Sequence, residues 1–444
     1  MRDHRVSVKT NDKVKKSLRF SFFDGVFASV MVGFTQEYFI PFLLLLGATA
    51  RQIGMLSAFP NFFASLTQLI SADLAEKLKS RKRVINIFVL LHAIMLLPMA
   101  AIALINRVNP FVFILFVVLF TSFGALATPA WGSLMSDLVA KEKRGAYFGW
   151  RNKTLGFVAV SAAFMAGFFL NVMKKVNIYY GFAIIFVLAF LFRMLSWYFL
   201  KKMYEPPLEY KKEHYFSIID FLKGMRKSNF ARFVLFVSMM SFAVNLASPF
   251  FSVLMLQNLH FSYLLYAFIT ITATLTIYLM MSRWGKHADK IGNLKVIKFV
   301  SPLLGVIPLL WIFNRNPVFL VLAQIFSGFL WAGFNLCTTN FIYDSVTAQK
   351  LTRCISYFNV LNGLALCAGA LFGGFLLHWL PPVFGYRILT LFLISSVLRI
   401  AIGIFMPHKL KEVRTVEQVN NNKLFFSIIG IRPILGIERK ILRY

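Results

Sequence analysis

The sequence predicts an all-α membrane protein in which twelve transmembrane helices form two six-helix bundles related by a parallel repeat. Hydrophobic residues make up 58% of the 444 residues, Phe alone occurs 51 times, and the mean hydropathy is +0.69. The core of a soluble protein of this length does not need so much apolar surface. The apolar residues also fall into long runs, and short charged motifs recur about half a chain apart. These three features together predict a membrane protein with an internal duplication.

The apolar runs are each long enough to cross a membrane. A hydrocarbon layer is ~30 Å thick and a helix rises about 1.5 Å per residue, so roughly 20 residues are needed. Because the layer holds no water to satisfy the backbone, each run must be helical. We expect the spans near 20–46, 52–72, 84–105, 110–136, 146–172, 177–200, 230–257, 261–283, 294–313, 317–343, 354–379 and 385–406.

The repeat is parallel because six spans return the chain to its starting side, so both halves enter the membrane in the same orientation. Between the halves, Glu205-Pro206-Pro207 ends a helix, and the charges that follow suggest a linker with a short surface helix. The tail mixes apolar and basic residues, which favours either a segment lying on the membrane or disorder. We divide the chain into a cytoplasmic N-terminal segment, a first bundle, a linker, a second bundle and a basic tail, at 1–19, 20–200, 201–229, 230–407 and 408–444.

The net charge of +31 would suit a nucleic-acid-binding protein, but its distribution argues against that class. With twelve spans both termini share one side, and most Lys and Arg lie in the loops of that side. This positive-inside bias places both termini in the cytoplasm and the protein in the cytoplasmic (plasma) membrane, with its loops against an anionic inner leaflet. The opposite side holds only Arg51, Arg107, Lys174, Lys175, Arg315 and Arg387.

Motifs of enzymes and metal sites are missing from the sequence. There is no P-loop, no His-Glu-x-x-His and no Gly-x-Ser-x-Gly, so we expect no catalysis, no ATP drive and no cofactor. Cys337, Cys354 and Cys367 lack the spacing of a metal site and lie away from the outer side, which predicts free thiols. His92, His260 and His378 lie on different helices, so we expect no shared metal site or His relay. We expect a monomer.

Charged motifs recur at matching places in the two halves. Gly285-Lys-His-Ala-Asp289-Lys-Ile-Gly292-Asn-Leu-Lys295 follows the eighth span, and a looser copy around Asp73 follows the second. After the fourth span Asp137 precedes Arg144, and after the tenth span Asp344 precedes Arg353.

These motifs resemble the signature loops of the major facilitator superfamily, and the resemblance covers about 18–407. They are specific for the family and not for a substrate. Asn293 stands where a basic residue is usual, and the first-half copy has Leu69 and Glu76 at its two glycine positions, in a longer loop. The resemblance implies alternating access, in which two bundles rock about a central cavity.

The resemblance also implies a cytoplasmic gate. Asp73 would face Arg144 and the start of the eleventh helix, and Asp289 would face Arg353 and the start of the fifth. The alternative is that these charges only mark topology and cap helices. The candidate gate includes, from the same motifs, Asp137, Gly285, Gly292, Lys295 and Asp344.

Two carboxylates lie inside the first span. Of the 17 acidic residues, all but Asp24 and Glu37 lie in cytoplasmic segments or at cytoplasmic helix ends. An ionisable group inside a membrane is costly unless it faces a cavity or a partner, so both are candidates for proton or ion coupling, Glu37 first. The alternative for Glu37 is a wet position, where it caps a helix or pairs with Arg51.

Two arginines lie inside the sixth and twelfth spans, at matching places. Arg193 could pair with Asp24, and Arg399 would play the matching part in the other half. We expect a structural or gating role for both. The alternative is that each side chain snorkels to the headgroups.

Neutral polar residues near the middle of the spans are candidates to line a substrate cavity. Their amides and hydroxyls can hydrogen-bond sugars, nucleosides or amphiphiles, and they can equally hold helices together. They are Asn61, Gln68, Thr128, Asn245, Asn335, Thr339, Asn340, Asn359 and Asn362. In the eleventh span, Gly369 and Gly373 have the small-xxx-small spacing that lets helices approach closely.

We therefore expect a secondary transporter of the symporter type that moves a small solute by alternating access on a proton or other ion gradient. A rival within the class is an exporter of amphiphiles, lysolipids or drugs, which the many phenylalanines suggest. A rival of another class is a membrane receptor or regulatory protein that binds without transporting.

Overall fold

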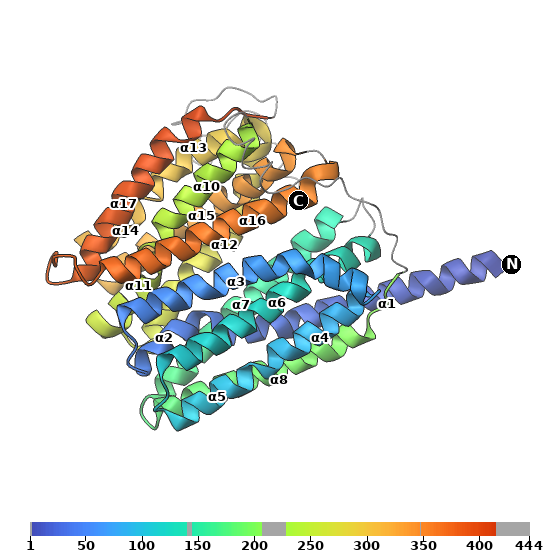
Figure 1. Cartoon of the computed structure of the whole chain (residues 1–444), viewed down its shortest axis with the longest axis horizontal. Helices are drawn as coiled ribbons and strands as arrows, with labels where there is room; N and C mark the ends of the chain where they lie inside the picture. Colours follow the sequence, from blue (N-terminus) through green and yellow to red (C-terminus); the bar gives the residue numbers. More distant parts are fainter. Residues whose placement is uncertain (1, 140–143, 207–227, 347, 414–444) are drawn as a thin grey trace. The chain divides into compact units, whose positions relative to one another are not determined.

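The computed structural model describes residues 2–139, 144–206, 228–346 and 348–413 (Figure 1). The secondary structure of these residues is helical, apart from an isolated bridge between Val383 and Tyr386. The all-α class is therefore confirmed. The surface helix expected in the linker and the tail beyond 413 lie outside the described residues. The helices pack into two compact units, each described by itself.

The first unit contains the described helices as far as α8, together with Pro249–Ile271 from the second half of the chain. In it α1 packs against α7 and α8, α3 against α6, and α4 against α6 and α8. Its elements are α1 (Arg2–Thr35), the 3-10 turn η1 (Gln36–Tyr38), α2 (Phe39–Leu45), α3 (Ala50–Lys77), α4 (Arg81–Ile94), α5 (Leu96–Ile105), α6 (Pro110–Leu138), α7 (Arg144–Met173), α8 (Ile178–Lys202), most of α11 (Ser248–Val253), η3 (Leu254–Asn258) and the beginning of α12 (Tyr263–Ile291).

The second unit repeats this arrangement with the remaining helices. In it α10 packs against α16 and α17, and α13 packs against α15 and α17. The unit takes the rest of α12 from Thr272 onward, whereas Pro249–Ile271 of the predicted second bundle belongs to the first unit. Its other elements are α10 (Asn229–Asn245), α13 (Asn293–Leu303), α14 (Val306–Phe313), α15 (Pro317–Ser345), α16 (Ala348–Leu376), α17 (Arg387–Phe405) and η4 (Pro407–Lys409).

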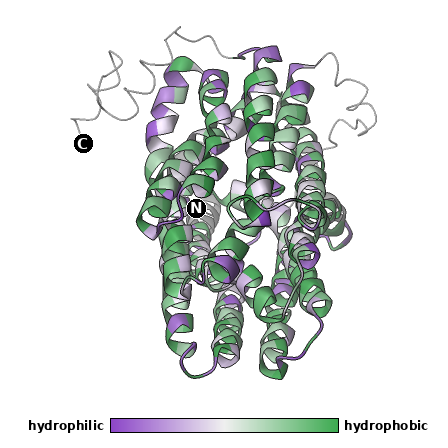
Figure 2. Cartoon of the chain, turned by 90° about the vertical axis from the view of Figure 1, so that its left-hand side faces the viewer, coloured by the Kyte–Doolittle hydropathy of each residue, from purple (hydrophilic) through white to green (hydrophobic). Residues whose placement is uncertain are grey.

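Eleven helical stretches of the described chain are long and apolar enough to cross a membrane. Figure 2 shows hydrophobic residues along most of the helix lengths. The second predicted span corresponds to α3, which has 28 residues but is not among the eleven. It carries the polar residues Arg51, Asn61, Gln68 and Asp73. Together α3 and the eleven stretches agree with twelve spans.

Helix starts repeat between the halves. Pro110 is the first residue of α6 and Asn109 caps it, since the Asn109 side chain accepts a hydrogen bond from Phe111 N at 3.0 Å. Pro317 and Asn316 begin α15 in the same way. Asn is a strong N-cap, and Pro suits the first helical position because its missing N–H has no partner there anyway.

Close helix contacts depend on glycine, as the sequence predicts for α16. A Cβ at Gly369 would lie 2.3 Å from the carbonyl oxygen of Phe242, and one at Gly373 would lie 2.1 Å from that of Leu246. No side chain fits at such distances, so the small-xxx-small prediction is confirmed. These two residues set how closely α16 packs against α10.

Candidate functional site

A chain of buried hydrogen bonds crosses the first unit from α1 through α8 to α4. Asp24 exposes only 4% of its surface, and its Oδ1 accepts a hydrogen bond from Ser196 Oγ at 2.7 Å. Ser196 Oγ accepts one from Arg193 Nη1 at 2.9 Å. Arg193 Nε donates to His92 Nδ1 at 3.0 Å. The expected pairing of Asp24 with Arg193 therefore runs through the hydroxyl of Ser196.

His92 ends this chain as a neutral ring. Because its Nδ1 accepts a hydrogen bond from Arg193, its single proton must lie on Nε2. The ring lies against Phe120, with 3.9 Å between the centroids. Sequence reasoning considered His92 only for a His relay and missed this contact, because its partner lies 101 residues away in the chain.

Arg151, on α7, is a second cation beside Asp24. Its Nη2 lies 3.8 Å from Asp24 Oδ2 and donates to the carbonyl of Ser21 at 3.0 Å. Its guanidinium carbon lies 4.6 Å from the centroid of the Trp131 ring. Three buried atoms here, Arg151 Nε, Ser21 Oγ and Trp131 Nε1, have no hydrogen-bond partner among the described residues. One carboxylate therefore lies between two arginines, next to polar atoms that are open to a further partner.

Glu37 lies in η1, where the helix of the first span is interrupted. Its main-chain carbonyl accepts a hydrogen bond from Tyr266 Oη at 2.8 Å, and the neighbouring Tyr38 hydroxyl donates to the carbonyl of Ala163. The side chain is partly buried, and its carboxylate has no hydrogen-bond or ion-pair partner within the described chain. The backbone is thus fixed on both sides of a carboxylate that is itself unbound.

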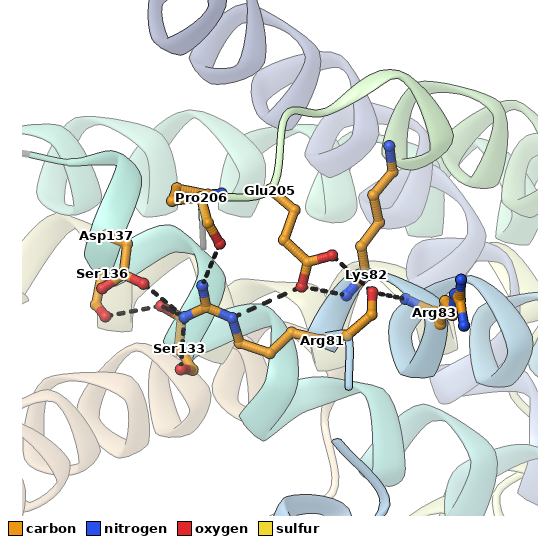
Figure 3. A network of polar contacts seen from close by, with 9 residues as sticks. Arg81, Lys82, Arg83, Ser133, Ser136, Asp137, Glu205 and Pro206 are labelled. Carbon is orange, nitrogen blue, oxygen red and sulfur yellow. Dashed lines mark hydrogen bonds and ion pairs between the residues drawn. The ribbon is translucent and has the colours of Figure 1, made fainter. Parts of the chain in front are cut away.

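A second polar network surrounds the start of α4 (Figure 3). Arg81 is buried, and its Nη1 donates to Asp137 Oδ2 at 2.6 Å, near the end of α6. Glu205, which follows α8, accepts hydrogen bonds from Ser80 Oγ at 2.6 Å and from Lys82 N at 3.2 Å. Asp137 thus compensates the charge of the buried guanidinium, and Glu205 binds a free N–H group at the helix start.

The second unit has the matching network at the start of α13, with one difference. Leu294 N donates to Glu412 Oε2 at 2.7 Å, as Lys82 N does to Glu205. Asn293 Nδ2 donates to Asp344 Oδ2 at 2.8 Å, where the first unit has Arg81. The repeat therefore keeps the geometry but replaces a charged donor with a neutral one. Sequence reasoning selected the two aspartates and missed the two glutamates.

The predicted gate pairs stay predictions. The side chains of Asp73, Arg144 and Arg353 lie outside the described ones, although their backbones belong to α3, α7 and α16. Asp289 is exposed in the last turns of α12.

The signature glycine before α13 has a clear structural reason. Gly292 has φ +90°, a conformation that other residues rarely adopt. The preceding Gly285 lies inside α12, and Lys295 follows in the first turn of α13. In the first unit the residue before the corresponding helix is Ser80, and Glu76 lies inside α3. Ser80, and not Glu76, therefore directly precedes the helix that corresponds to α13.

Four of the predicted cavity residues are exposed on their units despite lying in span-length helices: Asn61, Thr128, Asn335 and Thr339. The side chains of Asn61, Thr128 and Thr339 donate hydrogen bonds to main-chain carbonyls of their own helices. Thr128 Oγ1, for example, donates to Gly124 O at 3.0 Å. Of the others, Gln68, Asn245, Asn340, Asn359 and Asn362 are partly buried.

Arg399 is buried inside the second unit, with 2% of its surface exposed, and so it does not snorkel. Its guanidinium donates to Ser395 Oγ at 3.0 Å, to Val244 O at 3.1 Å and to Leu304 O at 3.4 Å. The two carbonyls lie at the ends of α10 and α13, where a helix dipole attracts a cation.

The described residues contain no group of three side chains that could hold a metal ion, and Cys337, Cys354 and Cys367 are free thiols.

Comparison with known proteins agrees with this architecture. A model of the Major Facilitator Superfamily matches residues 25–311 and 233–437. Among curated proteins, none matches this sequence. A crystal structure of the nucleoside transporter NupG is similar, with a TM-score of 0.66, 14% identity, and coverage of 90% of this chain and 100% of that one. A bacterial homologue of the human lysosomal transporter Spinster, inward-facing and occupied, gives a TM-score of 0.59 at 13% identity, covering 89% and 95%.

Proposed function

The chain belongs to the Major Facilitator Superfamily, and we propose that it is a secondary transporter that couples the movement of a small polar solute to protons through Asp24. We further propose that it works by alternating access as a monomer in the cytoplasmic membrane, with both termini in the cytoplasm. The coupling is supported by one observation above all. Asp24 is a buried carboxylate that contacts Ser196 on α8 and lies near Arg151 on α7.

Protonation of Asp24 would change the contacts between three helices. The charged carboxylate holds the Ser196 hydroxyl and attracts the Arg151 guanidinium. The neutral acid would no longer attract Arg151, whose Nε already has no partner among the described residues. A proton could thus favour a different arrangement of α1, α7 and α8, which is the differential interaction that coupling needs.

Glu37 is the second candidate for the coupling residue. Its carboxylate has no partner among the described residues, so its protonation would change fewer contacts than that of Asp24. We therefore place it after Asp24, which reverses the order expected from the sequence.

The substrate we propose is an uncharged polar molecule. The exposed mid-span candidates are amides and hydroxyls, which exchange hydrogen bonds with neutral ring oxygens, nitrogens and hydroxyls. A nucleoside has these groups, and NupG, which shares the fold, is a nucleoside transporter. Nucleosides and sugars are therefore the first solutes to test.

Uptake into proteoliposomes tests the proposal. We expect solute to accumulate against its gradient when the proton gradient is imposed, and only to equilibrate without it. Asp24→Asn should abolish uphill accumulation and retain solute exchange, whereas Asp12→Asn, on an exposed part of the same helix, should behave like the wild type. Unimpaired uphill uptake by Asp24→Asn would reject the coupling role. Binding without flux would instead favour a receptor.

A further inference from the structure

The last turn of α8 holds two lysines on aromatic rings. Lys201 Nζ lies 4.3 Å from the centroid of the Trp197 ring, and Lys202 Nζ lies 4.0 Å from that of Tyr198. Lys202 Nζ also donates to Tyr198 Oη at 2.5 Å. Each ring lies four residues before its lysine, so the helix itself brings the pair together. The contact holds a long side chain that would otherwise move freely.

A third cation of this kind lies on α1 and is linked to Lys202 through ring contacts. The Arg19 guanidinium carbon is 5.8 Å from the Phe23 centroid, and the Phe23 ring stacks on Phe199 with 5.3 Å between centroids. Phe199 in turn lies 5.5 Å from Tyr198. The exposed cations Arg19 and Lys202 are therefore connected by an aromatic surface that spans two helices. We call Arg19, Phe23, Tyr198, Phe199 and Lys202 the basic–aromatic ledge.

The ledge ends a long apolar stripe on α8. Residues with helical spacing are exposed along this helix, which is itself long and apolar enough to cross a membrane. A stripe of this kind suits acyl chains, and an aromatic residue followed by lysine is typical of the depth where headgroups begin. The exposed residues of the stripe are Tyr180, Ile184, Val187, Leu191, Leu195 and Tyr198.

The positive charge of the ledge is not neutralised by nearby acids of the described chain. Glu205, the carboxylate nearest in sequence to Lys202, is bound by Ser80 Oγ and Lys82 N. Asp24, the carboxylate nearest in sequence to Arg19, is buried in its own cluster. The ledge thus presents two exposed cations next to the apolar stripe of α8. Neither of the two described carboxylates nearest in sequence neutralises them.

We propose that the basic–aromatic ledge binds the headgroup of an anionic phospholipid. Arg19 and Lys202 bind the phosphate from two helices, the aromatic rings lie under the glycerol region, and an acyl chain follows the apolar stripe of α8. This site is separate from the Asp24 cluster and does not depend on which solute is moved.

Native mass spectrometry of the detergent-solubilised protein tests this site with phosphatidylglycerol, with phosphatidylcholine as the neutral lipid. Each cation at an anionic surface strengthens binding about fivefold, so Arg19→Gln combined with Lys202→Gln should weaken phosphatidylglycerol binding roughly 25-fold. Phosphatidylcholine should bind more weakly to the wild type and be little changed in the variant. An excess of inorganic phosphate should not displace the lipid.

The matched control is Lys174→Gln with Lys175→Gln, an exposed pair just before the opposite end of the same helix. It removes the same charge and should leave lipid binding within about twofold of the wild type. Tyr198→Leu keeps both cations but removes a ring, and should weaken binding severalfold. The proposal would be overturned if the control pair lost as much phosphatidylglycerol binding as Arg19→Gln combined with Lys202→Gln. Equal binding of the two lipids to the wild type would also overturn it. Thermal unfolding of each variant separates loss of the site from loss of the fold.

Discussion

The hydroxyl of Ser196 joins two buried charged groups, since it donates to Asp24 and accepts from Arg193. In Ser196→Ala both groups lose this partner at a buried position. We expect the free energy of unfolding to fall by about 1–3 kcal/mol. We also expect uptake driven by a proton gradient to weaken. Thermal unfolding in detergent and proteoliposome uptake measure the two effects.

Ser65→Ala is the control for this change. The Ser65 hydroxyl donates to the carbonyl of Asn61 in its own helix, on a partly exposed part of α3. Its removal should change stability by no more than about 0.5 kcal/mol, as is usual for surface substitutions. If Ser196→Ala behaved like Ser65→Ala in both measurements, Ser196 would have no role in joining the cluster.

His92 can be tested as the acceptor for Arg193. His92→Gln keeps an oxygen acceptor that can reach the guanidinium, whereas His92→Leu fills similar space and leaves Arg193 Nε without its partner. We expect the leucine variant to be less stable than the glutamine variant by about 1–3 kcal/mol, because an unsatisfied buried charged donor is costly. Comparing their thermal unfolding checks this, and equal stability of the two would show that the hydrogen bond contributes little.

The contact between α10 and α16 gives a test of helix packing. At Gly373 an added Cβ would meet the Leu246 carbonyl at 2.1 Å, so Gly373→Ala must push two backbones apart. We expect a loss of about 1–3 kcal/mol, as for overpacked cores. Gly132→Ala, on α6, meets nothing within 4 Å and should be neutral or slightly stabilising. A thermal unfolding temperature of Gly373→Ala at or above that of Gly132→Ala would contradict the tight contact.

The starts of α4 and α13 should differ in their need for an acid. Asp137 binds the buried guanidinium of Arg81, whereas Asp344 accepts from the neutral amide of Asn293. Asp137→Asn should therefore destabilise more, by about 1–3 kcal/mol, because it leaves a buried cation less compensated, although the Asp137 side chain is 43% exposed and partly screened. In Asp344→Asn, the change at the hydrogen bond with Asn293 should account for about 0.5–1.5 kcal/mol. Denaturation of the two single variants, side by side, decides whether Arg81 makes this difference.

These elements also show where sequence reasoning succeeds. Long apolar runs and Asn-Pro starts are local signals, so the spans and the helix starts at Pro110 and Pro317 could be predicted. The glycine spacing at Gly369 and Gly373 is equally local, because both residues lie on one helix. The contacts of Glu205 and Glu412 could not be found in this way. Each binds a helix start more than a hundred residues away, and only the folded chain brings them together.

The boundary between the two units is another feature that the repeat could not predict. A repeat places Pro249–Ile271 in the second half, yet this segment packs in the first unit. The contacts are specific, since Tyr266 Oη donates to Glu37 O, and a Cβ at Gly167 would lie 2.5 Å from Ala267 Cβ. Sequence similarity between halves reports which residues are equivalent, but packing depends on which surfaces meet.

The orientation that the charge distribution predicts for the chain in the membrane can be tested directly. Lys79 follows α3 in a basic segment, and Lys175 precedes α8 on the side that has few cations; both are exposed. In a background from which Cys337, Cys354 and Cys367 have been removed, Lys175→Cys should react in intact cells with a maleimide that cannot cross membranes.

Lys79→Cys should react with the same reagent only after the membrane is permeabilised. The physical reason is that moving many lysines and arginines across the bilayer is far less favourable than moving the few of the opposite side. Labelling of Lys79→Cys from outside would show that the orientation is the opposite of the predicted one. Arg19 and Lys202 would then meet lipid of the opposite leaflet. Labelling at both positions before permeabilisation would mean that the helices between them, from α4 to α7, do not place Lys79 and Lys175 on opposite sides.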